Sequence, residues 1–163
     1  MAAPISSLER VRAALAEAGL GLELCEFPAS TRSAAEAAAA IGCELAQIAK
    51  SLVFRDRDAD RPVLVVASGV NRVDEKRLAA HLGTRIGRAD ADFVRRRTGF
   101  AIGGVAPLGH LEPPRIVIDA DLMALEAVWA AAGTPNAVFR LTPAELAAVT
   151  GGEVAEIKAA PHL

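Results

Sequence analysis

The chain has 163 residues, 52% of them hydrophobic, and a formal net charge of −2. This length is typical of one folded domain, and the hydrophobic fraction excludes an intrinsically disordered chain. The slightly acidic balance and the 4% aromatic content argue against a broad, sequence-independent grip on nucleic acid, but they leave room for a local basic patch. We therefore expect a single domain over residues 1–163.

The first part of the chain predicts four helices and three strands. The helices begin at capping residues such as Ser6 and Ser33, and we expect them over about residues 6–19, 33–40, 74–82 and 90–97. The strands are short apolar or alternating runs over residues 22–27, 47–54 and 62–67. The charged run 55–61 between the last two strands predicts a solvated hairpin tip.

The last third of the chain adds four strands and one helix. The strands are expected over residues 115–119, 127–131, 137–141 and 154–157, and the helix over residues 142–149. Gly133-Thr134-Pro135-Asn136 predicts a hairpin turn between the second and third of these strands. Because strands and helices do not alternate regularly, we expect an α+β domain. Its sheet should be mixed, mostly antiparallel and barrel-like, surrounded by helices.

Residues 98–110 form an apolar loop with four glycines and one proline. A solvated linker would be polar, so this composition indicates a packed loop that holds unusual backbone angles. Such a loop can present main-chain N–H groups to a ligand, as anion nests and oxyanion holes do. It can equally be a tight turn between two core strands, and composition alone does not separate these readings.

Lys50 lies in an otherwise apolar, strand-like segment, where Ile48 and Leu52 share its face by alternation. If both faces of the strand are buried, the lysine points toward a pocket or a paired carboxylate, because lysines are almost never buried without a partner. The alternative is an edge-strand lysine that faces water and guards against aggregation.

The remaining reactive residues form no familiar catalytic or metal-binding pattern. Cys25 and Cys43 lack the spacing of a zinc site or a disulfide framework, so we expect two small core residues in a reducing cytoplasm. His110 follows the glycine loop and is the one histidine with a claim to function. Asp119 is either a pocket acid or a turn and cap residue. With no serine elbow and no metal-ligand spacing, we expect no metal and no cofactor.

Several stretches occur together in an order that resembles a known family. They are Ile48-Ala49-Lys50-Ser51-Leu52-Val53-Phe54, Ser68-Gly69 with Asn71-Arg72-Val73-Asp74, the glycine loop from Thr98 to His110, and Val128-Trp129-Ala130-Ala131-Ala132-Gly133. This ordered set resembles the YbaK/EbsC family of aminoacyl-tRNA deacylases, which are related to the editing domain of bacterial prolyl-tRNA synthetases. The resemblance covers about residues 25–157, and the family fold is compatible with the expected α+β domain.

The resemblance implies a trans-editing deacylase that hydrolyses the ester between a wrongly attached small amino acid and tRNA, with tRNA-Pro as the expected tRNA. It implies catalytic roles for Lys50 and for Gly103 and Gly104 of the glycine loop, and His110 is a further catalytic candidate because it directly follows that loop. The residues expected to contact substrate are Phe27, Ile48, Ser51, Leu52, Ser68, Val105, Ala106, Pro107, Gly109 and Ala131. Because a lysine ammonium with an ordinary pKa is charged at neutral pH, an electrostatic role suits Lys50 better than general-base catalysis.

Two departures bear on specificity. Ser51 stands where the alanine-specific branch commonly has asparagine, and Val138 stands near an acidic position of the cysteine-specific branch. The expected partners are the acceptor end of mischarged tRNA and prolyl-tRNA synthetase, in the cytoplasm and without a membrane. The alternatives are a non-catalytic module that binds an aminoacyl or nucleotide end or a synthetase, and a hydrolase of small free esters or amides.

Overall fold

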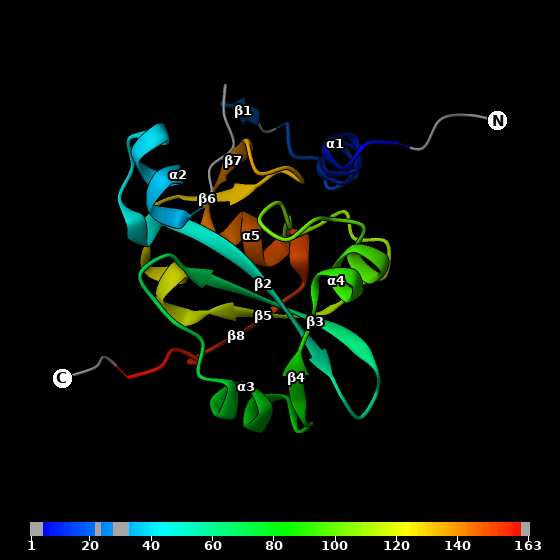
Figure 1. Ribbon diagram of the computed structural model, residues 1–163. Helices are drawn as coiled ribbons and strands as arrows, with labels where there is room; N and C mark the ends of the chain where they lie inside the picture. Colours follow the sequence, from blue (N-terminus) through cyan, green and yellow to red (C-terminus); the bar gives the residue numbers. More distant parts are fainter. Residues whose placement is uncertain (1–4, 22–23, 28–32, 161–163) are drawn as a thin grey trace.

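Eight strands form one sheet in the computed structural model, which describes residues 5–21, 24–27 and 33–160 (Figure 1). The order along the sheet is β1-β7-β6-β2-β3-β5-β8, and β4 pairs with β2 off this path. The strands are β1 (Leu24–Glu26), β2 (Ile48–Asp56), β3 (Arg61–Ser68), β4 (Ile86–Arg88), β5 (Arg115–Asp119), β6 (Val128–Ala131), β7 (Ala137–Leu141) and β8 (Glu153–Ala155).

The sheet is mixed and mostly antiparallel, as the sequence predicts. The pairs β1–β7, β2–β3, β2–β4 and β6–β7 are antiparallel, whereas β2–β6, β3–β5 and β5–β8 are parallel. Among the described residues β1 and β8 do not pair with each other, so the curved sheet stays open rather than closing into a barrel. The α+β class is confirmed.

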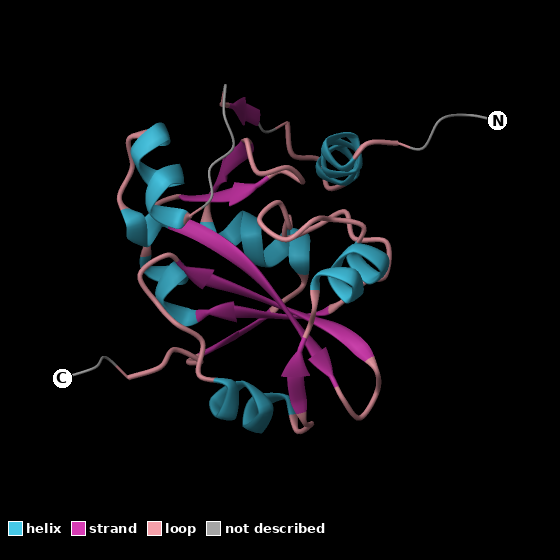
Figure 2. Ribbon diagram, viewed as in Figure 1, coloured by secondary structure: helices cyan, strands magenta, loops and turns pink. Residues whose placement is uncertain are grey.

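Five helices surround this sheet (Figure 2). They are α1 (Ser7–Glu17), α2 (Ala34–Ile41), α3 (Glu75–Leu82), α4 (Ala91–Thr98) and α5 (Pro143–Thr150), with 3₁₀ turns η1 (Leu45–Gln47) and η2 (Ala120–Ala124). The predicted caps form, because the side chains of Ser6, Ser33 and Thr142 each accept a hydrogen bond from the N–H three residues later. None of these helices, within the described ranges, has the length and apolar character needed to cross a membrane.

The two faces of the sheet are buried under different helices. One face packs its largest cluster, which includes Val66 and Phe139, against α1, α4 and α5. The opposite face buries Val63 and Val65 under Leu78 and Leu82 of α3. A third, smaller cluster joins α2 to Ile48 at the start of β2. Figure 1 accordingly shows α3 below β2, and α1 and α4 above it at the right.

The structure differs from the expectations at the two cysteines and at one added strand. Cys25 is exposed on β1 and Cys43 is only half-buried, so neither is a core residue; both are free thiols. The short strand β4 was not predicted, because three residues carry no readable alternation and this strand exists through its pairing with residues 54–56. The expected strand at residues 22–27 includes Leu22 and Glu23, which lie outside the described residues.

The charged run after β2 forms the predicted hairpin tip and carries a network around two carboxylates. Asp58 accepts hydrogen bonds from the backbone N–H of Arg85 at 2.8 Å, from its Nε at 2.7 Å and from the Thr84 hydroxyl at 2.8 Å. Asp56 accepts from the same hydroxyl at 2.7 Å. The hairpin is thereby tied to the segment that leads into β4.

Acidification should release this tie. The backbone and side-chain hydrogen bonds from Arg85 and Thr84 lower the pKa of Asp58 from 3.8 to about 2. A carboxylate whose pKa is lowered by folding contributes stability above its unfolded pKa and loses it as the pH falls toward the folded value. We expect the melting-temperature difference between the wild type and Asp58→Asn to be largest near pH 6 and to shrink steadily between pH 4 and pH 2. A difference that is constant over this range would contradict the assignment.

Candidate functional site

The edge of β2 that faces away from β3 is interrupted. On that edge β6 pairs only with Ile48 and Ala49, and β4 pairs only with residues 54–56. Residues 50–53 pair with β3 on the other edge. Within the described ranges no strand pairs with residues 50–53 on the edge that faces away from β3. The sheet therefore has a gap, four residues long, beside the middle of its central strand.

A cavity of about 770 Å³ lies at this gap. It touches every residue of β2 from Ile48 to Phe54. Because successive side chains of a strand point to opposite faces, a cavity that contacts seven successive residues must lie against the strand's edge. The volume is within the range of small-molecule sites in proteins.

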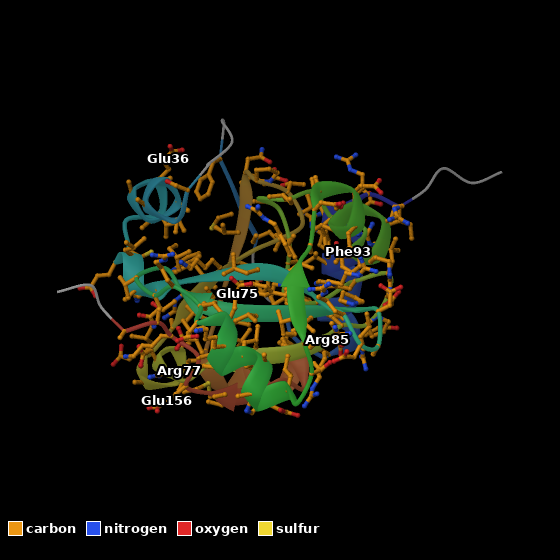
Figure 3. All side chains as sticks on the ribbon, turned by 60° about the horizontal axis from the view of Figure 1, so that its bottom comes forward. Glu36, Glu75, Arg77, Arg85, Phe93 and Glu156 are labelled. Carbon is orange, nitrogen blue, oxygen red and sulfur yellow. The ribbon has the colours of Figure 1, made fainter. Side chains whose placement is uncertain are left out.

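The cavity walls come from segments far apart in the sequence, and they are mainly apolar. Around β2 the lining residues are Ser33, Ala34 and Ala37 at α2, Glu75 at α3, Arg88 and Ala89 at β4, Val94 on α4, Ile102, Gly103 and Val105 in the glycine loop, and Trp129, Ala131, Thr134, Pro135, Ala137 and Val138 around the β6–β7 turn. In Figure 3, Glu75 lies near the centre of the view between α3 and β2, whereas Glu36 lies on the outer side of α2.

Lys50 lines this cavity, which supports the pocket reading over a lysine that faces open water. Burial lowers its pKa, the carboxylate of Asp119 acts in the opposite direction, and Arg72 lowers it further. Arg72 and Arg88, which lines the cavity, have no ion-pair partner among the described side chains. The site therefore combines an apolar interior with cationic groups at Lys50, Arg72 and Arg88.

Asp119 anchors the polar side of the site from inside the sheet. It is 1% exposed, and its carboxylate accepts hydrogen bonds from the Ser68 N–H at 3.0 Å and the Asn71 side chain at 2.8 Å. It also caps η2 by accepting from the Asp121 N–H at 3.0 Å. The cap reading of Asp119 is correct, and the same carboxylate fixes the loop that carries Arg72.

The glycine loop reaches the cavity through only part of its length. Gly103 is exposed, has φ of +92°, and a Cβ built on it would meet nothing within 4 Å. Gly104 is buried and does not line the cavity. A Cβ added to it would lie 3.0 Å from the Cα of Thr134. The two neighbouring glycines therefore differ in what they do: Gly103 faces the cavity, and Gly104 allows the loop to pack on the β6–β7 turn.

His110 and Arg10 hold the loop from behind. The Nε2–H of His110 donates to the Ala106 carbonyl at 2.6 Å, and burial lowers the pKa of this histidine. Arg10 donates from Nε to the Gly109 carbonyl at 3.1 Å and from Nη2 to the Gly99 carbonyl at 2.8 Å. His110 does not line the cavity. This position suits a residue that shapes the loop.

The other expected substrate contacts divide into two groups. Ile48, Ser51, Leu52, Val105 and Ala131 line the cavity together with Lys50 and Gly103. Phe27, Ser68, Ala106, Pro107 and Gly109 lie outside its lining. The Ser68 hydroxyl donates to the Ala46 carbonyl at 2.8 Å, and Phe27 is tied through its main chain to Asn136.

Sequence reasoning missed several lining residues, above all Arg88, Glu75 and Trp129. Trp129 lay within a quoted motif, and Glu75 follows the helix cap Asp74, but neither pattern indicates a direction toward β2. Arg88 is brought to the cavity by the pairing of β4 with β2, for which the sequence gives no local signal.

Comparisons with known proteins agree on the family. A family model described as an aminoacyl-tRNA editing domain matches residues 28–149. The protein YwhH of Bacillus subtilis, of uncharacterised function, is 34% identical over 140 residues, which cover 86% of this chain and 88% of YwhH. A proline–tRNA ligase of Limosilactobacillus fermentum is 31% identical over 94 residues, which cover 55% of this chain and 16% of the ligase.

A solved structure described as a candidate trans-editing enzyme for prolyl-tRNA synthetase superposes with a TM-score of 0.90 at 46% identity, covering 97% of this chain and all of that one. Because the family model spans most of the chain and a relative of similar length exceeds 30% identity, the chain belongs to the aminoacyl-tRNA editing domain family, as its resemblance to YbaK proteins predicts.

Proposed function

We propose that this protein is a trans-editing deacylase that hydrolyses the ester bond of a small amino acid wrongly attached to tRNA-Pro. The observation that carries the proposal is the meeting of Lys50 and Gly103 in one apolar cavity at the interrupted edge of β2. Membership of the aminoacyl-tRNA editing family supports the reaction class. The likeness to a candidate trans-editing enzyme and to a proline–tRNA ligase supports the choice of tRNA.

Hydrolysis of the ester requires few protein groups beyond these residues. A water oxygen attacks the ester carbonyl, a tetrahedral oxyanion forms, and the ribose oxygen leaves with a proton. Since an aminoacyl ester is already activated, electrostatic stabilisation of the oxyanion and correct positioning can provide much of the acceleration. The ammonium of Lys50 would act as a point charge on the terminal phosphate or on the carbonyl oxygen. The neighbouring Arg72 and Arg88 would strengthen the pull on the polyanionic tRNA end.

Amino-acid selection would depend mainly on volume and apolarity. The walls beside Lys50 are formed by small or aliphatic side chains, among them Ala34, Ala37 and Val138. An apolar pocket distinguishes one methylene by only about 1–3 kcal/mol, so alanine-sized to valine-sized side chains should react at graded rates. Because apolar Val138 stands in this wall, near an acidic position of the cysteine-specific branch, a cysteine-specific site is disfavoured.

We propose further that residues 1–163 act as one editing domain in the cytoplasm, where tRNA is charged. The partners would be the acceptor end of mischarged tRNA and, for access to that tRNA, prolyl-tRNA synthetase. The rival function is a module that binds the aminoacyl end without turnover. The two are separated by single-turnover deacylation of Ala-tRNA-Pro: product release above the uncatalysed rate supports the enzyme, and saturable binding without it supports the module.

Lys50→Ala should lower kcat/KM for Ala-tRNA-Pro by about 10²–10³-fold, the usual range for a lost electrostatic contact to a reacting oxyanion. The fold should persist, because the Lys50 side chain makes no hydrogen bond or ion pair with another described residue. The matched control is Lys76→Ala, which removes an exposed lysine of α3 that does not line the cavity. Equal activity in the folded Lys50 variant and the control would remove Lys50 from the mechanism.

Gly103→Ala should reduce deacylation strongly while lowering the melting temperature only slightly. Gly103 and Gly151 have positive φ of +92° and +63°, and in both cases an added Cβ would meet nothing within 4 Å, so each variant introduces backbone strain without a steric clash. Gly151 follows α5 and does not line the cavity. Gly151→Ala is therefore the control for strain alone. If the two variants lose activity to the same extent, the cavity wall at Gly103 has no part in substrate binding.

A further inference from the structure

The unpaired segment of β2 carries main-chain groups that face the cavity. The Ile48 carbonyl accepts from the Gly69 N–H on the β3 side, whereas the Arg57 N–H donates to the Arg85 carbonyl on the β4 side. Backbone direction alternates along a strand, so even-numbered residues direct their N–H and C=O toward β3 and odd-numbered residues direct theirs away from it. The N–H and C=O groups of Ser51 and Val53 therefore point into the gap.

These groups are available to a ligand. Buried main-chain donors and acceptors are nearly always hydrogen-bonded in folded proteins. In this part of the sheet, as far as the described residues show, no strand supplies partners for Ser51 or Val53 on the cavity side. Just before the gap, β6 runs parallel to β2 and pairs with Ile48 and Ala49. A ligand that continues the β6 ladder by one residue would complete the pairing.

An aminoacyl group has the chemistry of one such residue. In a parallel ladder, a residue of one strand bonds two residues of the neighbouring strand. Its N–H donates to the C=O of one of them, and its C=O accepts from the N–H of the residue two positions later on that same neighbouring strand. The amine and the ester carbonyl of an aminoacyl-tRNA have the same spacing, and they would pair with the Ser51 carbonyl and the Val53 N–H. This is strand addition reduced to a single residue.

Ser51 offers a second acceptor at the same place. Its hydroxyl oxygen is buried and has no hydrogen-bond partner among the described residues, although Ser51 lines the cavity. A rotation about χ1 would break no hydrogen bond, and we expect this oxygen to turn toward a ligand bound at the Ser51 carbonyl. An amine bound there would meet two acceptors, one from the main chain and one from the side chain.

We propose that the free edge of β2 at Ser51 and Val53 reads the substrate's α-amino group and selects primary over secondary amines. The inference rests on the proposed function and adds a rule that pocket size does not supply. In either protonation state a secondary amine has one N–H fewer than a primary amine, and its substituent occupies that hydrogen's place. Prolyl-tRNA, the correctly charged product, carries a secondary amine. The edge would thus protect prolyl-tRNA even though proline and valine are similar in size.

The charge around the gap fits recognition of a neutral amine. Lys50 and Arg88 line the cavity with Arg72 beside them, whereas Glu75 is the one carboxylate among the described lining residues. The carboxylate of Asp119, also near Lys50, is already occupied by hydrogen bonds from Ser68, Asn71 and Asp121. A like charge nearby disfavours a protonated amine. A neutral primary amine has two hydrogens for the two acceptors at Ser51. A neutral secondary amine has one, so one of these acceptors would lose its partner.

The test compares two isomeric substrates on the same tRNA-Pro: 2-aminobutyrate, which has a primary amine, and N-methylalanine, which has a secondary amine and the same atoms. Single-turnover deacylation is measured for both and for alanine. We expect alanine and 2-aminobutyrate to react within about tenfold of each other, and N-methylalanine about 10- to 100-fold more slowly than 2-aminobutyrate, as one lost hydrogen bond implies. Equal rates for the two isomers would overturn the proposal.

The outcome is distinguishable from failure of the proposed function. If alanine itself is not released, the deacylase proposal fails; if alanine is released and the isomers react equally, only the amine rule fails. Ser51→Ala provides a second readout. It should slow 2-aminobutyrate release and leave N-methylalanine release nearly unchanged. The ratio of the 2-aminobutyrate rate to the N-methylalanine rate should therefore fall severalfold. An unchanged ratio would show that the Ser51 hydroxyl is not the second acceptor.

Discussion

The interruption in the pairing of β2 is the constraint on which the rest of the site depends. β6 and β4 each occupy one end of the same edge, so the middle of the strand borders a cavity instead of a neighbour. The position of the gap is fixed by the eight residue pairs between β2 and β3. A slip of one residue would turn Lys50 to the other face and would exchange the main-chain groups that face the cavity.

The glycine loop depends on contacts behind it. Its own regular hydrogen bonding is limited, and Arg10 of α1 ties its two ends by donating to the carbonyls of Gly99 and Gly109. The same guanidinium lies 4.8 Å from the ring centroid of Phe100, a cation–π contact, and His110 packs edge-on against that ring at 5.0 Å. Gly103 can therefore stay exposed at the cavity while residues 104–108 of the loop are buried. The role of α1 in this fold is to fix a loop that is distant in sequence.

Local signals in the sequence predicted most of the elements. The caps at Ser6, Ser33 and Thr142, and the apolar runs of β2 and β3, were sufficient because capping and side-chain alternation are properties of neighbouring residues. Lys50 could be singled out because it breaks an apolar run. The exposure of Cys25 and the existence of β4 could not be predicted, since both depend on which strand forms an edge and which segment pairs with it. The separate positions of Gly103 and Gly104 likewise required the fold, because the sequence presents two equivalent glycines.

We expect the aminoacyl group of the substrate to bind in the gap beside β2. The most direct test is a crystal structure with a non-hydrolysable analogue, adenosine that carries alanine through a 3′-amide. We expect the alanyl unit between the free edge of β2 and Gly103, its amine within hydrogen-bond distance of the Ser51 carbonyl, and the adenosine on the side of Lys50. An analogue bound outside this cavity, or bound in it with its amine directed away from β2, would show that the aminoacyl group does not bind at the free edge of β2.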